Sequence, residues 1–412
     1  MLKLINAKQL TLGMYVHKFE GSWLSHPFWR SAFLLEDRKD LDAILASGVS
    51  ELWIDLSRGC GLPVAAPTAT AEPIPPAVPV PASPLPPASA AVPAPVRQPG
   101  SSMSQELVQA KRILLQSRDA VTSLFNDVRL GKAIDVNGAV PLVEEVTSSV
   151  MRNPGALVSI VRLKNRDDYT YMHSVAVCAL MVALARQLGL DEAQSRDAAM
   201  GGLMHDLGKA LMPLDVLNKP GSLTEDEYGI MKRHPEAGWQ LLKEGGGATP
   251  ATLDIALHHH EKVDGSGYPH RLKSTDITLM ARMGAVCDVY DAITSNRPYK
   301  AGWDPGTSIR RMNSWAGHFD PVILKAFIRS IGIYPVGSLV RLESGRLGVV
   351  TEQNDSALLT PKVTVFFSLK SNEPISRQVL DLAGRHNHEK IVAVEDKEKW
   401  GFKYLDEIWS EV

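Results

Sequence analysis

The sequence contains little cysteine: only Cys60, Cys178 and Cys287 occur in 412 residues, and no two of them form a C-x-x-C pair. An odd, widely spaced set of this kind does not build a disulfide framework and is typical of proteins in a reducing compartment. We therefore expect domains held together by apolar cores, for which a hydrophobic content of 44% is sufficient.

Long apolar runs are also absent. The longest covers residues 174–185, well short of the about 20 residues that a membrane-spanning helix needs, so we expect no membrane segment. The start of the chain, Met-Leu-Lys-Leu-Ile-Asn, lacks the basic start and the long apolar core of a signal peptide. Both absences favour a cytoplasmic protein.

The sequence also has no large excess of positive or negative charge. The chain has 44 lysines and arginines against 46 acidic residues, which leaves a net charge of −2. A protein that binds a nucleic-acid polymer is normally basic on at least one face, so this balance argues against that function. It does not exclude a small pocket for a phosphate group.

Proline is unevenly distributed, because 13 of the 27 prolines fall within residues 62–100, where only Glu72 and Arg97 are charged. Proline fixes φ and lacks an N–H, so this segment should form an extended, semi-rigid tether. A ligand for a proline-binding module is the alternative, and we favour the plain linker. At about 150 residues per domain the chain would hold two or three domains, with a linker at residues 61–101.

The segment before the linker, residues 1–60, predicts a small α+β domain. Strand-like runs occur at residues 14–17 and 51–54, and residues 40–46 suggest one short helix. Four aromatic residues lie close together and predict either a ligand face or, more often in so small a domain, its core. They are Trp23, Phe28, Trp29 and Phe33.

The pattern becomes helical after the linker and predicts an all-α domain over residues 102–335. An apolar stripe over residues 104–130 ends at Gly131, and Thr224 with Glu227 suggests a capping box. The stripe could pack on its own domain, which we favour, or form a homodimer. Further helices are expected at about 139–152, 155–165, 169–188, 191–204, 224–244, 250–259, 277–294 and 305–316.

From residue 336 the pattern changes to that of strands. Residues 338–342 and 347–351, separated by Ser344-Gly345, predict a hairpin, and residues 362–367 alternate as a strand does. We therefore expect a small β-rich extension over residues 336–412.

The helical region carries a series of metal-type ligands, since six of the 12 histidines fall between His173 and His260. Imidazole and carboxylate groups suit Fe, Mn, Zn or Ni. An adjacent His-Asp pair can serve two neighbouring metals with the carboxylate as a bridge, and such a pair of metals binds a water and clamps a phosphate oxygen. The candidate ligands are His173, His205, Asp206, His234, His259, His260 and Asp288.

Residues near the candidate ligands are expected to act without binding metal. Lys209 returns to the helix face of Asp206 and can neutralise a phosphate. His258 is expected to cap its helix or face solvent, Asp264 to stabilise the Gly-Ser-Gly turn and Asp291 to support a ligand. Cys287 is expected to be a small buried hydrophobe.

These motifs resemble those of the HD superfamily of metal-dependent phosphohydrolases, on His173, His205-Asp206 and Asp288. The segment His259-His-Glu-Lys-Val-Asp-Gly-Ser-Gly-Tyr-Pro269 and the segment over residues 288–300 are similar to the hallmarks of its HD-GYP branch. The resemblance covers about residues 160–335. Residues 12–16, 22–28 and 48–55 also resemble the uncharacterised domain that often precedes HD-GYP in bacterial proteins.

The resemblance implies a cyclic di-GMP phosphodiesterase that forms pGpG and/or GMP, with the seven candidate ligands as the metal site. It implies that Asp206 bridges the metals, that Lys209 is catalytic, and that Arg297 and Lys300 bind substrate phosphate. Gly267, Tyr268 and Pro269 match the loop that the family places beside substrate and in contacts with GGDEF-type diguanylate cyclases.

One position departs from the family pattern. Members with three metals carry a glutamate four residues before the first histidine, whereas this chain has Tyr169 there, next to Asp168. An uncharged phenol is a poor ligand for a divalent ion, so we predict two metals per chain. Without thiolate ligands, Fe or Mn is favoured, and Zn or Ni also suit the set.

The mechanism that follows is attack on phosphorus by a hydroxide bridging the two metals, with Lys209 offsetting the developing charge and a 3′-oxygen leaving. Two alternatives remain open. The domain could be a degenerate receptor that binds cyclic di-GMP without cleaving it, or it could hydrolyse another cyclic dinucleotide or nucleotide, since nothing in the sequence identifies guanine.

Overall fold

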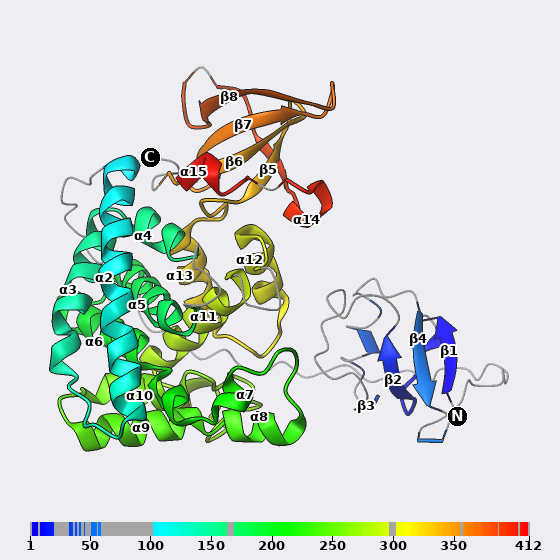
Figure 1. Ribbon diagram of the computed structural model, residues 1–412. Helices are drawn as coiled ribbons and strands as arrows, with labels where there is room; N and C mark the ends of the chain where they lie inside the picture. The colour runs from blue at the N-terminus through cyan, green and yellow to red at the C-terminus, as the bar shows by residue number, and fades with distance from the viewer. Residues whose placement is uncertain are drawn as a thin grey trace, which may run out of the picture. The chain divides into compact units, whose positions relative to one another are not determined.

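The fold was analysed in a computed structural model, which divides the chain into two compact units, Met1–Val92 and Pro93–Val412 (Figure 1). The residues that it describes are 2–6, 9–19, 33–35, 38, 41–42, 45, 51–55, 57–58, 102–162, 169–295, 302–354, 357–385, 387–402 and 404–410. The predicted fold class is confirmed: strands come first, a helical domain follows, and a β-sheet lies near the C-terminus.

The first unit contains a four-stranded antiparallel sheet with the strand order β1-β4-β2-β3. Both predicted strands are present, and Leu41, Asp42 and Leu45 of the expected helix are helical. Trp23, Phe28 and Trp29, the side chain of Phe33 and the proline-rich segment lie outside the described residues. The strands are β1 (Leu2–Asn6), β2 (Tyr15–Phe19), β3 (Phe33–Leu34) and β4 (Glu51–Asp55).

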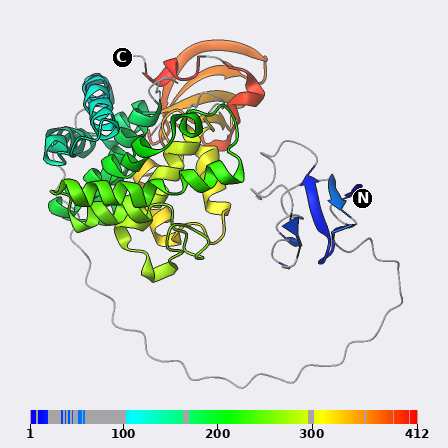
Figure 2. The same ribbon diagram turned by 60° about the horizontal axis from the view of Figure 1, so that its bottom comes forward.

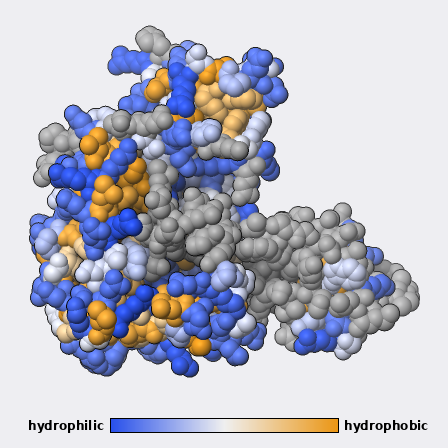
Figure 3. Space-filling model, in the orientation of Figure 1, coloured by the Kyte–Doolittle hydropathy of each residue, from blue (hydrophilic) through white to orange (hydrophobic). Residues whose placement is uncertain are grey.

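The second unit begins with the long helix α2 (Met103–Arg129), which is capped by Ser102 and Gln105 in a capping box. Its predicted apolar stripe, with Leu107, Ile113 and Phe125, is buried against neighbouring helices of the same unit. The opposite face still exposes Val108 and Leu115, and Figure 3 shows hydrophobic residues on the side of the molecule where α2 lies.

The helices after α2 surround α5, whose stretch Tyr171–Leu188 is long and apolar enough to cross a membrane but is 78% buried inside the protein. That burial identifies it as the core helix of the domain. The helices are α3 (Val140–Arg152), α4 (Pro154–Ile160), α5 (Tyr169–Leu188), α6 (Glu192–Met204), the 3-10 helix η5 (Leu207–Leu211), α7 (Leu214–Leu217), α8 (Glu225–Met231), α9 (His234–Gly245), α10 (Pro250–His258), α11 (Leu279–Thr294), α12 (Pro305–Ser314) and α13 (Pro321–Ile331).

Two helix predictions need correction. The single helix expected over residues 224–244 is two helices, because the chain turns at Lys232–Arg233 and α9 restarts with Pro235 in its first turn. The capping box of Thr224 with Glu227 is confirmed. Helix α13 was not predicted, although Asp320 accepts hydrogen bonds from the first amides of this helix as an N-cap should.

The C-terminal region forms a five-stranded antiparallel sheet with the order β8-β7-β6-β5-β9. The predicted β5–β6 hairpin is confirmed. One face of the sheet shares the helical core through Leu339 and Leu347, and the other face has a small core of its own. The elements are β5 (Leu339–Leu342), β6 (Arg346–Glu352), β7 (Lys362–Ser368), β8 (Glu373–Asp381), β9 (Ile391–Val394), α14 (Lys397–Trp400) and α15 (Glu407–Ser410).

A buried carboxylate joins α2 to α3 and predicts a stability difference. Glu106 accepts hydrogen bonds from Ser149 Oγ at 2.7 Å and Arg152 Nη2 at 2.8 Å. Glu106→Ala leaves both donors without that partner and should lower the free energy of unfolding by about 1–3 kcal/mol, as measured by urea denaturation. The control is Glu145→Ala, which removes a partly exposed pair with Arg112 at 3.7 Å and should cost less than about 1 kcal/mol. Equal losses in the two variants would contradict this assignment.

Candidate metal centre

The seven predicted ligands come from five helices or the residues directly after them, and their side chains meet in one cluster. Helix α5 contributes His173, the end of α6 contributes His205 and Asp206, and the start of α9 contributes His234. The end of α10 contributes His259 and His260, and α11 contributes Asp288. His260 is partly buried, and the other six are fully buried. In Figure 2 the green segments, around residues 200–260, come toward the viewer.

Hydrogen bonds from Nδ1 orient four of the imidazoles. The Nδ1 atoms of His205 and His234 lie 2.8 Å from the carbonyl oxygens of Gly202 and Met231, and that of His259 lies 3.0 Å from Ile255 O. A carbonyl only accepts, so each Nδ1 carries the proton and each Nε2 presents a lone pair to the cluster. His173 is held in the same way by a carboxylate, with its Nδ1 at 2.6 Å from Asp291 Oδ2.

Asp206 lies between two groups of imidazoles. Its Oδ1 is 3.2 Å from His234 Nε2 and 3.7 Å from His259 Nε2, whereas its Oδ2 is 3.4 Å from His173 Nε2 and 3.3 Å from His205 Nε2. Within each group the possible ligand atoms lie within 4.8 Å of one another, and Asp206 belongs to both. This is the arrangement that a bridging carboxylate requires. The groups are Asp206, His234, His259, His260 and His173, His205, Asp206.

Asp288 also lies between the two groups. Its Oδ1 is 3.0 Å from His173 Nε2 and 3.8 Å from His205 Nε2, and its Oδ2 is 3.7 Å from His260 Nδ1. Lys209 forms an ion pair with Oδ2 of Asp206 from η5. Both carboxylates therefore contact His173 and His205, and Lys209 pairs with one of them.

The donors fit divalent cations because several of them have no other partner. His205 Nε2 and Asp206 Oδ1 are buried and make no hydrogen bond within the described part of the chain. The Nε2 atoms of His234 and His259 lie 3.3 Å apart although both Nδ1 protons are already used. Two facing lone pairs repel unless a cation lies between them, so this geometry favours metal binding.

The pKa shifts agree with this interpretation. Burial lowers the pKa of His234, of His259 and of His260, that of His260 to about 3, so these imidazoles stay neutral and available as ligands. Burial alone would raise the pKa of Asp206, but Lys209 and the neighbouring imidazoles hold it well below its usual range. Burial lowers the pKa of His173, but three carboxylates outweigh this effect and raise it to about 10; a bound cation would replace that proton.

The predicted loop of Gly267, Tyr268 and Pro269 lies against the cluster. The Tyr268 ring stacks on that of His260 with 4.7 Å between centroids, and its amide donates to His260 O at 3.3 Å. A Cβ on Gly267 would lie 2.4 Å from Lys262 N, so only glycine allows the loop to pass this close to the chain.

Glu261 was missed by the sequence analysis. It is buried and accepts hydrogen bonds from His270 N at 2.7 Å and Leu272 N at 3.1 Å, which holds both amides at the end of the loop. The available signal was its position directly after His259-His260, within a stretch of turn residues. A carboxylate there could have been expected to bind backbone amides.

The other residues singled out in the sequence lie beside the cluster or outside the described part of the chain. His258 turns away from the cluster, with its Nδ1 at 2.6 Å from Asp254 Oδ1 and its Nε2 at 2.9 Å from His270 Nδ1. Asp264 accepts from Ser266 N at 2.8 Å and stabilises the turn as predicted. Cys287 is buried, and burial raises its pKa. Arg297, Lys300, Asp168 and the side chain of Tyr169 lie outside the described residues.

Two family models match the chain. One, described as an HD domain, matches residues 157–323, and the other, described as a domain of unknown function (DUF3391), matches residues 2–139. The second model extends through the linker and α2, beyond the boundary at residue 60 that we predict.

Three relatives place the chain among phosphodiesterases. A cyclic di-GMP phosphodiesterase of Pseudomonas aeruginosa is 50% identical over 411 residues, which cover 100% of this chain and 96% of that protein. A cyclic di-GMP phosphodiesterase response regulator of Xanthomonas campestris is 44% identical over 35% of this chain and 39% of its own length. A 3′3′-cGAMP-specific phosphodiesterase of Vibrio cholerae is 33% identical over 46% of this chain and 42% of its own length.

Helix η5 packs so closely on α9 at Gly208 that one added methyl group should disturb the metal cluster. A Cβ on Gly208 would lie 2.0 Å from His234 O and 2.5 Å from Gly238 N. Gly208→Ala should therefore separate Asp206 and Lys209 from His234, lower the metal content measured by elemental analysis after Mn loading, and destabilise the fold by about 1–3 kcal/mol.

The matched control for Gly208→Ala is Gly229→Ala in α8, where an added Cβ meets nothing within 4 Å. This variant should keep its metal and be as stable as the original protein or slightly more so, since alanine favours a helix. A normal metal content in Gly208→Ala would show that the close contact does not hold the cluster together.

Proposed function

This chain belongs to the HD-GYP family and is a metal-dependent cyclic di-GMP phosphodiesterase, and we propose that it hydrolyses its substrate at the Asp206-centred cluster with two divalent metal ions. The observation that carries this proposal is the position of Asp206, whose two oxygens face separate groups of histidines. Asp206 is therefore the proposed bridge.

The two proposed metals share Asp206 and otherwise have different ligands. One ion would be held by His173, His205, Asp206 and Asp288, and the other by Asp206, His234, His259 and His260. Bound divalent ions supply a water that is activated near neutral pH and positive charge opposite the phosphate oxygens. The donors are imidazole and carboxylate only, so Fe or Mn is the proposed pair, and Zn or Ni would also fit this set.

Lys209 is proposed to stabilise the charge that develops on the phosphate. Its side chain is 22% exposed and paired with Asp206, so the ammonium group lies at the edge of the cluster, where a phosphate can reach it. In the reaction one water is consumed: its oxygen forms a bond to phosphorus, the bond from phosphorus to the 3′-oxygen breaks, and a proton goes to that oxygen. Arg297 and Lys300 are proposed as further phosphate contacts.

Tyr268 is proposed to form one wall of the substrate site together with Gly267 and Pro269. Its ring covers His260 and restricts the approach of water to that side of the cluster. The same loop is the proposed contact surface for GGDEF-type cyclases. We also propose that the protein is cytoplasmic and that it can form a homodimer.

Cyclic dinucleotides with different bases are candidate substrates of this site. The Vibrio cholerae relative is named for 3′3′-cGAMP, so a different cyclic dinucleotide is the second candidate substrate. A degenerate receptor is less consistent with this chain, because all seven metal ligands are retained and oriented toward one another.

Activity measurements on the metal-loaded protein test the proposed bridge and substrate together. Incubation with cyclic di-GMP should yield pGpG and/or GMP on chromatography, more rapidly than 3′3′-cGAMP is cleaved. Asp206→Ala should abolish product formation, whereas Asp215→Ala, at an exposed position on α7, should retain it. Binding without product would indicate a receptor, and normal turnover by Asp206→Ala would rule out the bridge.

The number of metals provides a separate test. Protein loaded with Fe or Mn under anaerobic conditions should contain two ions per chain, because Tyr169 stands where three-metal members carry a glutamate. Tyr169→Glu should raise the content toward three ions if that position adjoins the cluster. Three ions in the unaltered protein would contradict the two-metal proposal.

A further inference from the structure

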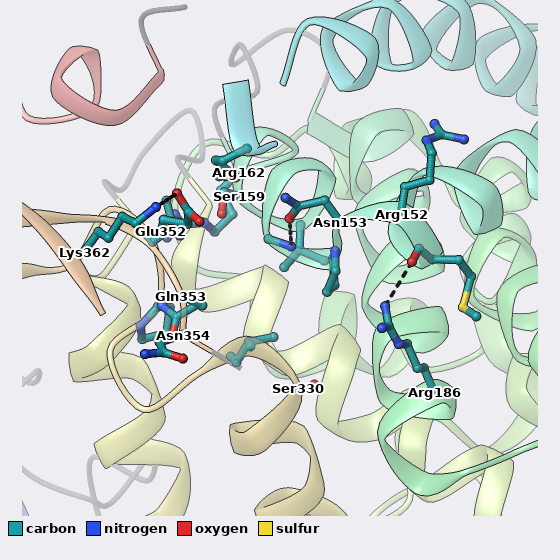
Figure 4. Close-up of a pocket in the computed structure, with 18 of the residues that line it drawn as sticks. Arg152, Asn153, Ser159, Arg162, Arg186, Ser330, Glu352, Gln353, Asn354 and Lys362 are labelled. Atoms are coloured by element: carbon teal, nitrogen blue, oxygen red, sulfur yellow. Dashed lines mark hydrogen bonds and ion pairs between the residues drawn. The ribbon is translucent and has the colours of Figure 1, made fainter. Parts of the chain in front are cut away.

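A cavity of about 470 Å³ lies between the helices and the C-terminal sheet (Figure 4). Arg162 and Arg186 line it at opposite ends, and its other two cations are paired with carboxylates, so these side chains do not form one anion site. A network of hydrogen-bonded side chains beside the metal cluster is more closely connected to the proposed reaction, because it ends on the loop that carries Tyr268.

The network consists of one carboxylate and two imidazoles. Asp254 Oδ1 lies 2.6 Å from His258 Nδ1, and His258 Nε2 lies 2.9 Å from His270 Nδ1. Asp254 and His258 lie one turn apart on α10, whereas His270 directly follows Pro269 in the loop. Both distances are those of hydrogen bonds, so the network ties the end of the loop to α10.

The carboxylate determines where each proton of the network lies. A carboxylate only accepts hydrogen bonds, so His258 Nδ1 carries a proton and, while this imidazole is neutral, its Nε2 has a lone pair. His270 Nδ1 must then carry the proton of the second hydrogen bond. The donors therefore point in one direction, from His270 through His258 to Asp254.

The other oxygen of Asp254 extends the network to α11. The Thr278 hydroxyl donates to Asp254 Oδ2 and accepts from Ala281 N at 3.2 Å as the N-cap of that helix. Asp254 therefore joins α10, the loop and the start of α11. The side chains of Asp254 and His258 are 22% and 14% exposed, so water competes only weakly for the bond between them.

Glu261 holds the same end of the loop through the backbone. Its carboxylate accepts from His270 N at 2.7 Å and from Leu272 N at 3.1 Å. His270 is therefore fixed at both its amide and its imidazole, two residues after Tyr268, whose ring stacks on His260. Removing the imidazole alone would loosen the loop while Glu261 and every proposed metal ligand stay in place.

We propose that His270, His258 and Asp254 are positioning residues that hold Tyr268 against the metal cluster and thereby increase the affinity for the cyclic dinucleotide. This inference rests on the proposed function, in which the Tyr268 loop forms one wall of the substrate site. The wall binds the substrate before and during the reaction alike, so weakening the network should raise KM and leave kcat unchanged.

Kinetics of two variants of His270 test the positioning role. His270 is exposed, so its side chain can be replaced without disturbing the core. His270→Leu removes the donor to His258 and should raise KM for cyclic di-GMP about fivefold, with kcat and Mn content unchanged. His270→Asn keeps an N–H donor near the place of Nδ1 and should return KM to within about twofold of the original value. An unchanged KM in His270→Leu, or an equal rise in His270→Asn, would overturn the proposal.

Nitrogen NMR of the histidine-labelled, Zn-loaded protein tests the network without turnover. At mildly alkaline pH the proton of His270 should lie on Nδ1. In Asp254→Asn the Thr278 hydroxyl still requires the acceptor oxygen, so the amide N–H faces His258 and the His270 proton should move to Nε2. The control Asp119→Asn, at an exposed position on α2, should leave it on Nδ1. A proton on Nε2 in the unaltered protein would contradict the network.

A failure of the proposed hydrolysis gives a different result from a failure of the positioning role. If the unaltered protein binds cyclic di-GMP without cleaving it, the hydrolysis is ruled out, and the Kd for cyclic di-GMP should still rise about fivefold in His270→Leu. An unchanged Kd in that variant would rule out the positioning role.

Discussion

The position of the Asp206 carboxylate between two groups of histidines is the constraint on which the structure depends. A buried carboxylate is costly unless positive charge compensates it. Lys209 compensates Oδ2, while Oδ1 faces His234 and His259, whose Nδ1 protons are already given to backbone carbonyls. The fold therefore assembles donors that require cations, so metal binding and the packing of the helices that carry them are thermodynamically linked.

Local hydrogen bonds orient the histidines of this cluster, and close packing between helices brings the histidines together. Each of His205, His234 and His259 is oriented by a carbonyl only three or four residues earlier, so short segments determine which nitrogen is free. Glycines then allow the segments to approach. A Cβ on Gly202 would lie 3.0 Å from the backbone of Cys178 in α5, and one on Gly208 would overlap α9.

The sequence predicted the cluster far better than its surroundings. Metal ligands are chemically distinctive, and the His205-Asp206 pair already suggested a bridge. Glu261 was missed because its partners are backbone amides, which no side-chain pattern reveals. Strand β8 was missed because most of its residues are exposed, which leaves no apolar alternation to detect. The break between α8 and α9 depends on tertiary packing, although Pro235 marked the restart.

The C-terminal sheet differs from the helices in sequence pattern, but it shares one hydrophobic core with them. Leu339 and Leu347 of the sheet and Trp409 of α15 are buried in the helical core, and Arg162 lies 5.6 Å from the Trp409 ring. Tyr290 of α11 belongs to the same buried core and packs on Phe327 of α13, with 5.0 Å between ring centroids. The sheet is therefore better regarded as a wall of the phosphodiesterase domain than as an appendage to it.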